Sequence, residues 1–292
     1  MTTPPRIERY AAFSDDPAGG NPAGVVLDAA SLGAVDMQRI AAQVGYSETA
    51  FVTGPIVPPD PHDETSSIPI RFFAPEGEVD FCGHATIATA VSIGEHHGLG
   101  DYVLGTRVGP VPITARREGS RTVGALHSPP VDCLPLENDL LTRILEALRW
   151  SRSDLDPALP PAVGFGGNRH PVLVARELDR LQELDYDFGA LQSLSRRHDW
   201  ITVQLVASIG SGQWRARDPF PWGGVVEDPA TGAAAAAFAG YLRAHAGAIA
   251  GDRLVITQGV EMGRPSRIEV ELTEGAAIVS GAAVRIDTPD EQ

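Results

Sequence analysis

Two short segments, Cys82-Gly83-His84-Ala85-Thr86 and Asp228-Pro229-Ala230-Thr231-Gly232, decide the fold because each opens a long alanine-rich stretch. Each follows an extended region that contains proline. Aligning their alanine-threonine pairs gives an offset of 145 residues, and half of the 292-residue chain is 146. A second match, Gly20-Asn21 with Gly167-Asn168, has an offset of 147 residues. Two matches at nearly one spacing indicate a duplicated fold, and such a fold offers a cleft between its halves.

The composition is that of a globular protein and excludes several functional classes. Apolar residues make up 43% of the chain, and the net charge is −15 without any basic run, so we expect no nucleic-acid partner. The cysteines Cys82 and Cys133 form no CxxC pair, which is typical of the cytoplasm. Met1–Ile7 has no apolar signal region, and Ala233–Leu242 is too short to cross a bilayer, so we expect no membrane partner.

Short apolar runs separated by glycine and proline predict many short strands. The expected strands are Ile7–Phe13, Gly24–Leu27, Glu48–Val52, Ile68–Phe73, Val111–Ala115, Thr122–Leu126, Pro171–Ala175, Ile201–Ala207, Leu254–Thr257, Arg267–Leu272 and Ala277–Ile286. The segment Arg116–Ser120 predicts a hairpin turn, and Pro58–Ser67 predicts a polar loop. We expect the crossover between the halves to lie within Asp132–Gly167.

Fewer segments predict helices. They are Asp36–Val44, Ala85–His97, Glu137–Trp150, Asp187–Arg197 and Pro229–Ala246. Ala85–His97 and Pro229–Ala246 are apolar nearly all round, which indicates burial. Many short strands and two buried helices predict an α+β fold in which each half curls its sheet around one helix. We expect two domains, 1–128 and 129–292, with the last strand a candidate to pack on the first domain.

Asp228 and Pro229 admit a structural and a functional interpretation. An acidic N-cap residue followed by proline at the first helical position predicts a helix start, and a cap alone explains the pair. The functional interpretation adds Gly223-Gly224, which lets a ligand approach the backbone closely. The N–H groups of Thr231 to Ala233 would then face an anion such as a carboxylate.

The first helix opens with Gly83 and His84, without a usual capping side chain, so its N–H donors are available to a ligand. A lone histidine is more often a partly buried structural residue. His84 lies at a predicted helix start, opposite Asp228 in the repeat. This position supports a functional role as well as it supports the structural one. The positive end of a helix dipole lowers the pKa of a histidine and favours the neutral imidazole.

Glu48 heads an otherwise apolar strand and is interpreted either as an exposed strand end or as a base. Matching Met37-Gln38 with Leu191-Gln192, 154 residues apart, puts Thr202 opposite Glu48. The acid is therefore present in one half only, as a single proton-transfer base would be. We expect an apolar cleft to raise the pKa of this carboxyl toward neutrality, as such a base requires.

Other chemistries find little support. A thiol-pair racemase needs a second cysteine near position 228, so Cys82 is interpreted as a packing residue. His62 and His96-His97 have no partners at metal-ligand spacing, so we expect no metal site. The glycine-rich segment Gly164-Phe165-Gly166-Gly167 matches neither GxGxxG nor a P-loop, so we expect no nucleotide and no other cofactor.

Six segments, in this order along nearly the whole chain, resemble the phenazine biosynthesis PhzF-like family, which is related in fold to diaminopimelate epimerase. They are Gly20–Leu27, Ser47–Phe51, Arg71–Pro75, Phe81–Thr86, Glu227–Ala234 and Gln258–Ser266. Two positions depart from the family pattern. Ala74 stands where threonine is frequent, and Ala233 stands where serine is frequent. The second change removes a hydroxyl from the expected anion site, which argues against carrying over the phenazine substrate itself.

The resemblance implies two similar domains, each a curved sheet around a central helix, with the active site between them and commonly a homodimer. It also implies cofactor-free isomerisation by proton transfer on a small cyclic amino or hydroxy acid. By motif match, Glu48 would be the acid/base, and His84 and Asp228 would line the site. The substrate-binding residues would be Ser47, Gly83, Thr231, Gly232 and Ala233.

Our hypothesis is an isomerase or epimerase that moves a proton on a small carboxylate substrate with Glu48 as base. Two alternatives remain open. One is a non-catalytic binding or scaffold protein on the same fold. The other is a two-base epimerase with Glu48 opposed by Cys82 or Asp228. The sequence identifies neither the substrate nor the proton that moves, and it does not establish the oligomeric state.

Overall fold

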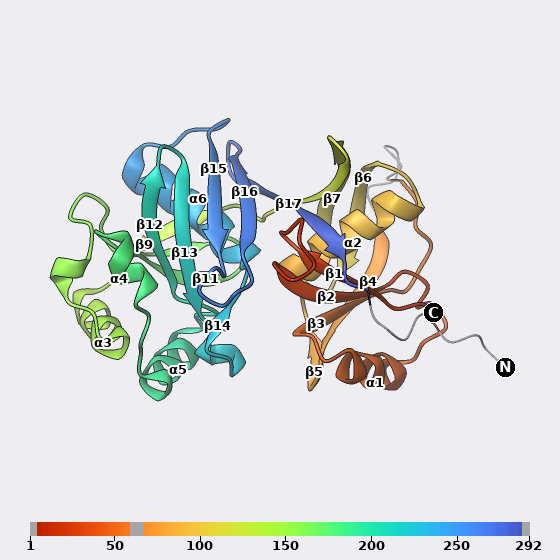
Figure 1. Cartoon of the computed structure of the whole chain (residues 1–292), viewed down its shortest axis with the longest axis horizontal. Coiled ribbons are helices and arrows are strands. Elements are labelled where there is room, and N and C mark those ends of the chain that lie inside the picture. The colour runs from red at the N-terminus through yellow and green to blue at the C-terminus, as the bar shows by residue number, and fades with distance from the viewer. Residues whose placement is uncertain (1–4, 59–66, 288–292) are drawn as a thin grey trace. The chain divides into compact units, whose positions relative to one another are not determined.

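The computed structural model describes residues 5–58 and 67–287, which form two compact units. The first unit contains the chain up to His127 and from Ser280 onward, and the second is Ser128–Val279 (Figure 1). The expected polar loop Pro58–Ser67, which includes His62, falls almost entirely outside the described residues. Within the described ranges, no helix combines the length and apolarity needed to cross a membrane.

Eight strands of the first unit close into a ring. Their hydrogen-bonded order is β1-β2-β3-β4-β6-β7-β8-β17, and β17 pairs back onto β1. The β2–β3 and β4–β6 pairs are parallel, and helix α1 (Ala34–Val44) joins the first of them. The strands are β1 (Glu8–Ala12), β2 (Asn21–Val26), β3 (Glu48–Val52), β4 (Ile68–Ala74), β6 (Gly100–Thr106), β7 (Gly109–Glu118), β8 (Arg121–His127) and β17 (Ala277–Arg285), with the short β5 (Gly77–Val79) paired to β4.

Helix α2 (Gly83–His96) is the central helix of this ring. Its residues from His84 to Gly94 are all buried, and it contacts β1, β2, β3, β7 and β8. Gly124 in β8 permits the close approach, because a Cβ at this position would lie 2.7 Å from the backbone oxygen of Ile87. The predicted buried helix is therefore confirmed, although it begins at Gly83 rather than Ala85.

Replacing Gly124 with Ala is expected to lower the free energy of unfolding by about 1–3 kcal/mol, the usual cost of overpacking a well-packed core. The added methyl meets the backbone of α2, which a side-chain rotation cannot move. Urea unfolding monitored by circular dichroism measures the change. Gly275→Ala is the matched control, because nothing lies within 4 Å of a Cβ there. Equal stability of the two variants would contradict the proposed close contact.

The second unit repeats these connections. Its strands pair in the order β9-β10-β11-β12-β13-β15-β16, and the β11–β12 and β13–β15 pairs are parallel, like β2–β3 and β4–β6. Helix α6 (Gly232–Ala246) joins β13 to β15, as α2 joins β4 to β6, and it contacts β9, β10, β11 and β16. The strands are β9 (Asp132–Pro135), β10 (Ala162–Phe165), β11 (Arg169–Val174), β12 (Gln204–Gly210), β13 (Gln213–Pro219), β14 (Glu227–Asp228), β15 (Arg253–Gln258) and β16 (Ser266–Leu272). The duplicated α+β fold predicted from the sequence is confirmed.

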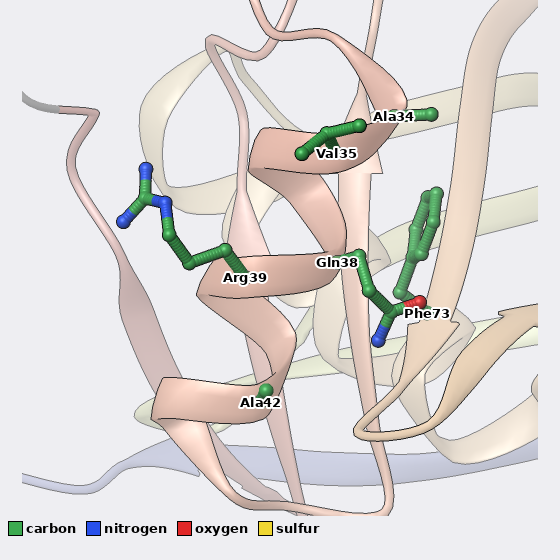
Figure 2. Close-up of a pocket in the computed structure, with 6 residues that line it drawn as sticks. All are labelled: Ala34, Val35, Gln38, Arg39, Ala42 and Phe73. Atoms are coloured by element: carbon green, nitrogen blue, oxygen red, sulfur yellow. The ribbon is translucent and has the colours of Figure 1, made fainter.

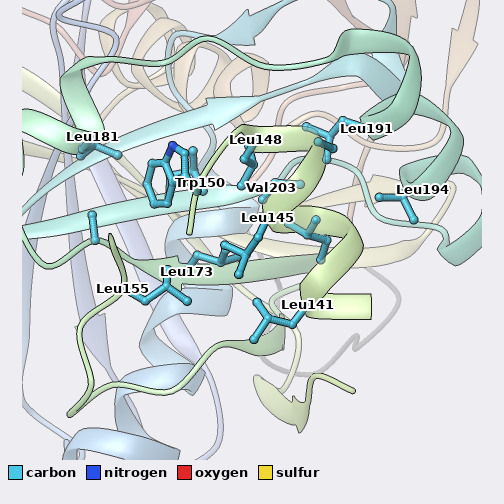
Figure 3. Packing of buried hydrophobic residues seen from close by; sticks show 14 of the residues in the cluster. Leu141, Leu145, Leu148, Trp150, Leu155, Leu173, Leu181, Leu191, Leu194 and Val203 are labelled. Carbon is cyan, nitrogen blue, oxygen red and sulfur yellow. The ribbon is translucent and has the colours of Figure 1, made fainter. Parts of the chain in front are cut away.

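A further hydrophobic cluster of the second unit lies under its outer helices. Helices α3 (Asn138–Leu148) and α5 (Phe188–His198) contribute leucines such as Leu145 and Leu191 to one cluster with Leu173 of β11 (Figure 3). The short helix α4 (Leu178–Gln182) adds Leu181. The two amphipathic helices expected in this half are confirmed to within two residues at each end.

Three local predictions are wrong. Asp228 and Pro229 do not start a helix, because Asp228 lies in β14, which pairs with β13, and α6 begins only at Gly232. The turn after β7 is shorter than Arg116–Ser120, because cross-strand pairing continues as far as Glu118. The crossover between the halves does not lie within Asp132–Gly167, because the second unit already begins at Ser128 and the segment forms β9, α3 and β10 of that unit.

Candidate active site

Glu48 is the first residue of β3, as predicted. The strand pairs in parallel with β2, where Ala23 is opposite Glu48, and the other four residues of β3 are buried. The Glu48 side chain is 19% exposed. Burial of the strand behind it holds the carboxylate at the edge of the core, where a small molecule can reach it.

The start of α2 places two further side chains beside Glu48. Cys82 is the N-cap residue, in an extended conformation, and His84 is the second residue of the helix. No side chain caps this helix N-terminus, as the sequence predicted. By helix geometry, its first N–H groups have no acceptor within the helix. The backbone therefore offers hydrogen-bond donors next to the carboxylate.

The four side chains form one cluster. Nε2 of His84 lies 3.4 Å from Oε2 of Glu48 and 3.3 Å from Oγ of Ser47. The thiol of Cys82 donates to Oε2 of Glu48 at 3.5 Å, and its sulfur is 3.3 Å from Nδ1 of His84. The structure thus brings together the predicted residues Ser47, Glu48 and His84. It surrounds the carboxylate with polar groups, whereas the sequence predicted an apolar cleft.

Burial lowers the pKa of the His84 imidazole below its usual value. The negative charge of Glu48 and a hydrogen bond with the backbone of Pro22 act in the opposite direction, without overcoming this effect. The imidazole is therefore neutral near pH 7, and one ring nitrogen has a lone pair that can accept a proton or a hydrogen bond. The sequence predicted the same direction from the helix dipole, but burial is the chief cause.

Cys82 belongs to this cluster and is more than the packing residue that the sequence indicated. Its position also bears on the two-base alternative. Two opposed bases each approach the reacting carbon to about 3–3.5 Å from opposite sides. Only 3.5 Å separates the Cys82 sulfur from the Glu48 carboxylate, so no carbon fits between them. This arrangement excludes Glu48 and Cys82 as opposed bases.

Asp228, Thr231 and Gln258 form a second cluster, at the start of α6. The Thr231 hydroxyl donates to Oδ2 of Asp228 at 2.6 Å, and the Gln258 amide donates to the Asp228 carbonyl at 2.8 Å and to the Thr231 hydroxyl at 3.0 Å. The sequence predicted that the backbone N–H of Thr231 would face an anion. It donates instead to Oε1 of Gln258 at 3.2 Å. The N–H groups of Gly232 and Ala233 have no acceptor within α6. Sequence reasoning missed Gln258, although it lies in one of the six family segments.

A buried ion pair explains why Asp228 extends β14 rather than capping α6. Arg217 of β13 binds both carboxylate oxygens of the neighbouring Glu227, at 3.0 and 2.6 Å. Both side chains are buried, and breaking such a pair typically costs about 3–5 kcal/mol. The pair fixes Glu227 against the sheet and sets the register in which Asp218 lies opposite Asp228. Burial raises the pKa of Asp218 well above its usual value, and the charges of Asp228 and Glu227 add to the effect.

The repeat confirms that the second unit has no counterpart of Glu48. The parallel pairs that match in the two units are Val25↔Ala50 and Val172↔Gln204. Counting back two residues from the second member of each pair gives Glu48 and Thr202, the match made from the sequence. The Thr202 hydroxyl is buried between Nδ1 of His170 and Oδ1 of Asp218, at 2.9 Å from each. This position is structural in the second unit.

A shallow cavity of about 440 Å³ lies elsewhere in the first unit, beside α1 (Figure 2). Gln38 points toward it but already donates to the backbone oxygens of Ala74 and Pro75. Arg39, the one charged residue of its lining, pairs with Asp36. The cavity contains no member of either cluster, and we assign it no chemistry. Its lining residues are Ala34, Val35, Gln38, Arg39, Ala42 and Phe73.

Known proteins resemble this chain over most of its length. The phenazine biosynthesis-like protein family (PhzC-PhzF) matches residues 10–288. A trans-2,3-dihydro-3-hydroxyanthranilate isomerase of Pseudomonas chlororaphis is 35% identical, over 87% of this chain and 86% of its own. An uncharacterized isomerase of Escherichia coli O157:H7, YddE, is 31% identical over 96% of each chain. The crystal structure of a phenazine biosynthesis protein of the PhzF family from Bacillus anthracis superposes with a TM-score of 0.83 at 25% identity, covering 96% of each chain.

The fold and these relatives define an enzyme of the isomerase class. The chain belongs to the phenazine biosynthesis-like family, of which PhzF-like isomerases are members. Membership supports the enzymatic hypothesis over a non-catalytic scaffold protein. The six segments that carried the resemblance all lie within the matched range, and they include both side-chain clusters described above.

Proposed function

We propose that this isomerase moves a proton on a small cyclic amino or hydroxy acid that bears a carboxylate, without a cofactor and with Glu48 as the acid/base. The observation that carries the proposal is the Glu48 carboxylate, held at the head of a buried strand and 3.4 Å from a neutral His84. The carboxylate takes a proton from one carbon of the substrate and, as the carboxylic acid, returns it to another. This step requires a C=C bond next to the carbon that loses its proton. The electron pair of the broken C–H bond forms a new C=C bond, and the electron pair of the original C=C bond forms the C–H bond at the carbon that receives the proton.

The surroundings of Glu48 support this chemistry. His84 and Ser47 offer hydrogen bonds to a polar group of the substrate that lies beside the carboxylate. The uncapped N-terminus of α2 places N–H dipoles where negative charge develops as the C–H bond breaks. Fixed dipoles of this kind stabilise a transition state because they need no reorganisation during the reaction.

We assign substrate binding in the second unit to the cluster at the start of α6. Asp228 is proposed to hold a polar group of the substrate, and the N–H groups of Gly232 and Ala233 a carboxylate, as helix N-termini commonly do. The relative from Pseudomonas chlororaphis is named for a cyclic hydroxy amino acid, which fits this substrate class. Ala233 contributes no side-chain hydroxyl, so we expect the preferred acid to differ from that compound. We also predict a homodimer, which light scattering after size-exclusion chromatography measures.

Deuterium incorporation tests the proposed function. The protein is incubated in D₂O with a panel of cyclic and α-amino acids, including the named dihydrohydroxyanthranilate, and each compound is then examined by NMR and mass spectrometry. We expect protein-dependent incorporation at a carbon-bound position in at least one cyclic acid. Glu48→Gln is the matched control for a contaminating activity. The proposal would be overturned if deuterium exchange persists in this variant, or if the natural protein catalyses no exchange with any compound of the panel.

A further inference from the structure

Gln258 is a buried glutamine whose side-chain amide makes three hydrogen bonds at the start of α6. Its Nε2 donates to the Asp228 carbonyl at 2.8 Å and to the Thr231 hydroxyl at 3.0 Å, and its Oε1 accepts from the Thr231 backbone N–H at 3.2 Å. We propose that Gln258 is a positioning residue, which acts through Thr231 to hold the Asp228 carboxylate in its substrate-binding orientation. This role rests on the substrate binding proposed for Asp228.

The Thr231 hydroxyl links the glutamine to the carboxylate. It accepts a hydrogen bond from the Gln258 amide and donates its own to Oδ2 of Asp228 at 2.6 Å. A hydroxyl has a single proton, so the proton that goes to Asp228 can go to no other acceptor. The chain of hydrogen bonds therefore runs in one direction, from the amide through the hydroxyl to the carboxylate. Neighbouring bonds in such a chain strengthen one another.

Thr231 gives up its usual task for this contact. It is the N-cap residue of α6, but its side chain accepts no hydrogen bond from that helix. Threonine at an N-cap normally accepts from the second or third N–H group of its helix and stabilises it. Here Gln258 and Asp228 keep the hydroxyl turned toward the carboxylate. Loss of a stabilising cap is typical of residues that serve a binding site, where function is bought with stability.

The sheet fixes the position of the glutamine. Gln258 is the last residue of β15 and pairs with Ala216 of β13 on one side and with Ser266 of β16 on the other. The next residue, Gly259, has a φ of +74°, and a Cβ at this position would lie 2.6 Å from the Pro229 carbonyl oxygen. Glycine thus allows the end of β15 to lie against the segment that leads into α6.

Steady-state kinetics test this role with a compound that the natural protein labels in D₂O. Gln258→Leu removes all three hydrogen bonds and should raise KM about 10–100-fold, the usual contribution of hydrogen bonds to a charged group. The value of kcat should stay within about threefold, because Glu48 still moves the proton and a loss of uniform binding changes KM alone. A merely structural role would instead lower kcat, through loss of folded protein, and leave KM as it is.

Thr231→Val removes the linking hydroxyl and keeps the shape of the side chain. It should also raise KM about 10–100-fold, and it replaces Gln258→Leu if circular dichroism shows that the latter does not fold. The double variant should raise KM no further than the larger of the two single changes, because both substitutions release the same carboxylate. Effects that multiply would show that the two residues act independently, and the proposed role would be wrong.

Gln204→Leu is the matched control. Gln204 is as fully buried as Gln258 and lies in the same unit, but no described residue makes a hydrogen bond with its side-chain amide. The same substitution at this position should therefore leave KM within about twofold, because it removes no hydrogen bond between protein groups.

Crystal structures of the natural protein and of Gln258→Leu provide a test that needs no substrate. In the variant, the Asp228 carboxylate should no longer accept from Thr231, whose hydroxyl should cap α6 instead. An unchanged KM, or a Thr231–Asp228 hydrogen bond that persists in the variant, would overturn the role of Gln258. Either result would leave the proposed isomerisation standing, because Glu48→Gln tests that function separately.

Discussion

Replacement of Glu48 by Gln is expected to lower kcat by about 10²–10⁴-fold, the usual contribution of a positioned general base. The amide is nearly the same size as the carboxylate but cannot accept the proton. Glu48 is the terminal residue of β3 and is partly exposed, so the variant should fold normally. The measurement is the initial rate of deuterium incorporation into a compound that the natural protein labels, with circular dichroism as the test of folding.

Glu76→Gln is the matched control for this prediction, since it removes an exposed carboxylate from the same unit. It should leave the rate within about twofold, because Glu76 belongs to neither side-chain cluster. The variant should also fold normally, since surface substitutions of this kind change stability little. A Glu48→Gln variant with undiminished activity would show that the proton moves elsewhere. Asp228 would then become the next candidate for the base.

The second large effect concerns the pH dependence of stability. Burial lowers the pKa of His170 from 6.5 to about 3. The unfolded chain therefore binds the proton more readily than the folded one, and the stability present above pH 6.5 is lost as the pH falls toward 3. One pKa unit corresponds to about 1.4 kcal/mol, so the full loss is about 5 kcal/mol, of which about 2 kcal/mol is lost by pH 5.

Urea unfolding of the natural protein and of His170→Asn, at several pH values between 7.5 and 5, measures this contribution. The asparagine amide can still donate to the Thr202 hydroxyl. The stability difference between the natural protein and the variant should change by about 2 kcal/mol, against the natural protein, as the pH falls from 7.5 to 5. Asp218, with its raised pKa, has the opposite pH dependence. It is present in both proteins, so the difference between their stabilities isolates the contribution of His170. His127→Asn, at an exposed histidine, is the control. Parallel curves for the natural protein and His170→Asn would mean that His170 is accessible to protons.

The elements that the sequence predicts well are those whose burial is visible in local residue patterns. The strand Glu48–Val52 is apolar after its first residue, and its bounds are as predicted. Helix α2 is small or apolar on every side, which only a central position explains. Strand β13 escaped prediction because Arg215 and Arg217 make it look polar. Their charges are neutralised by Glu261 and Glu227, 46 and 10 residues away along the chain, and local patterns do not show such distant partners.

The candidate site divides in the same way. Glu48 could be identified because the repeat has threonine, not an acid, at the matching position. His84 could be identified because it lies at a predicted helix start, opposite Asp228 in the repeat. The role of Cys82 could not, because its partner Glu48 is 34 residues away along the chain and only folding brings them together. The interpretation of Asp228 as an N-cap failed for a similar reason. Local rules favour a helix start, but pairing with β13 and the buried Arg217–Glu227 pair hold the segment in the sheet.

Strand β17 has a consequence for how the protein is made. The ring of the first unit closes only when β17 has paired with both β8 and β1, although its other strands all precede Ser128. A ribosome adds about 5–20 residues per second, so the 152 residues of Ser128–Val279 delay closure by roughly 8–30 s. During translation the edges of β1 and β8 stay open, and the nascent chain needs protection from aggregation until its last strand emerges.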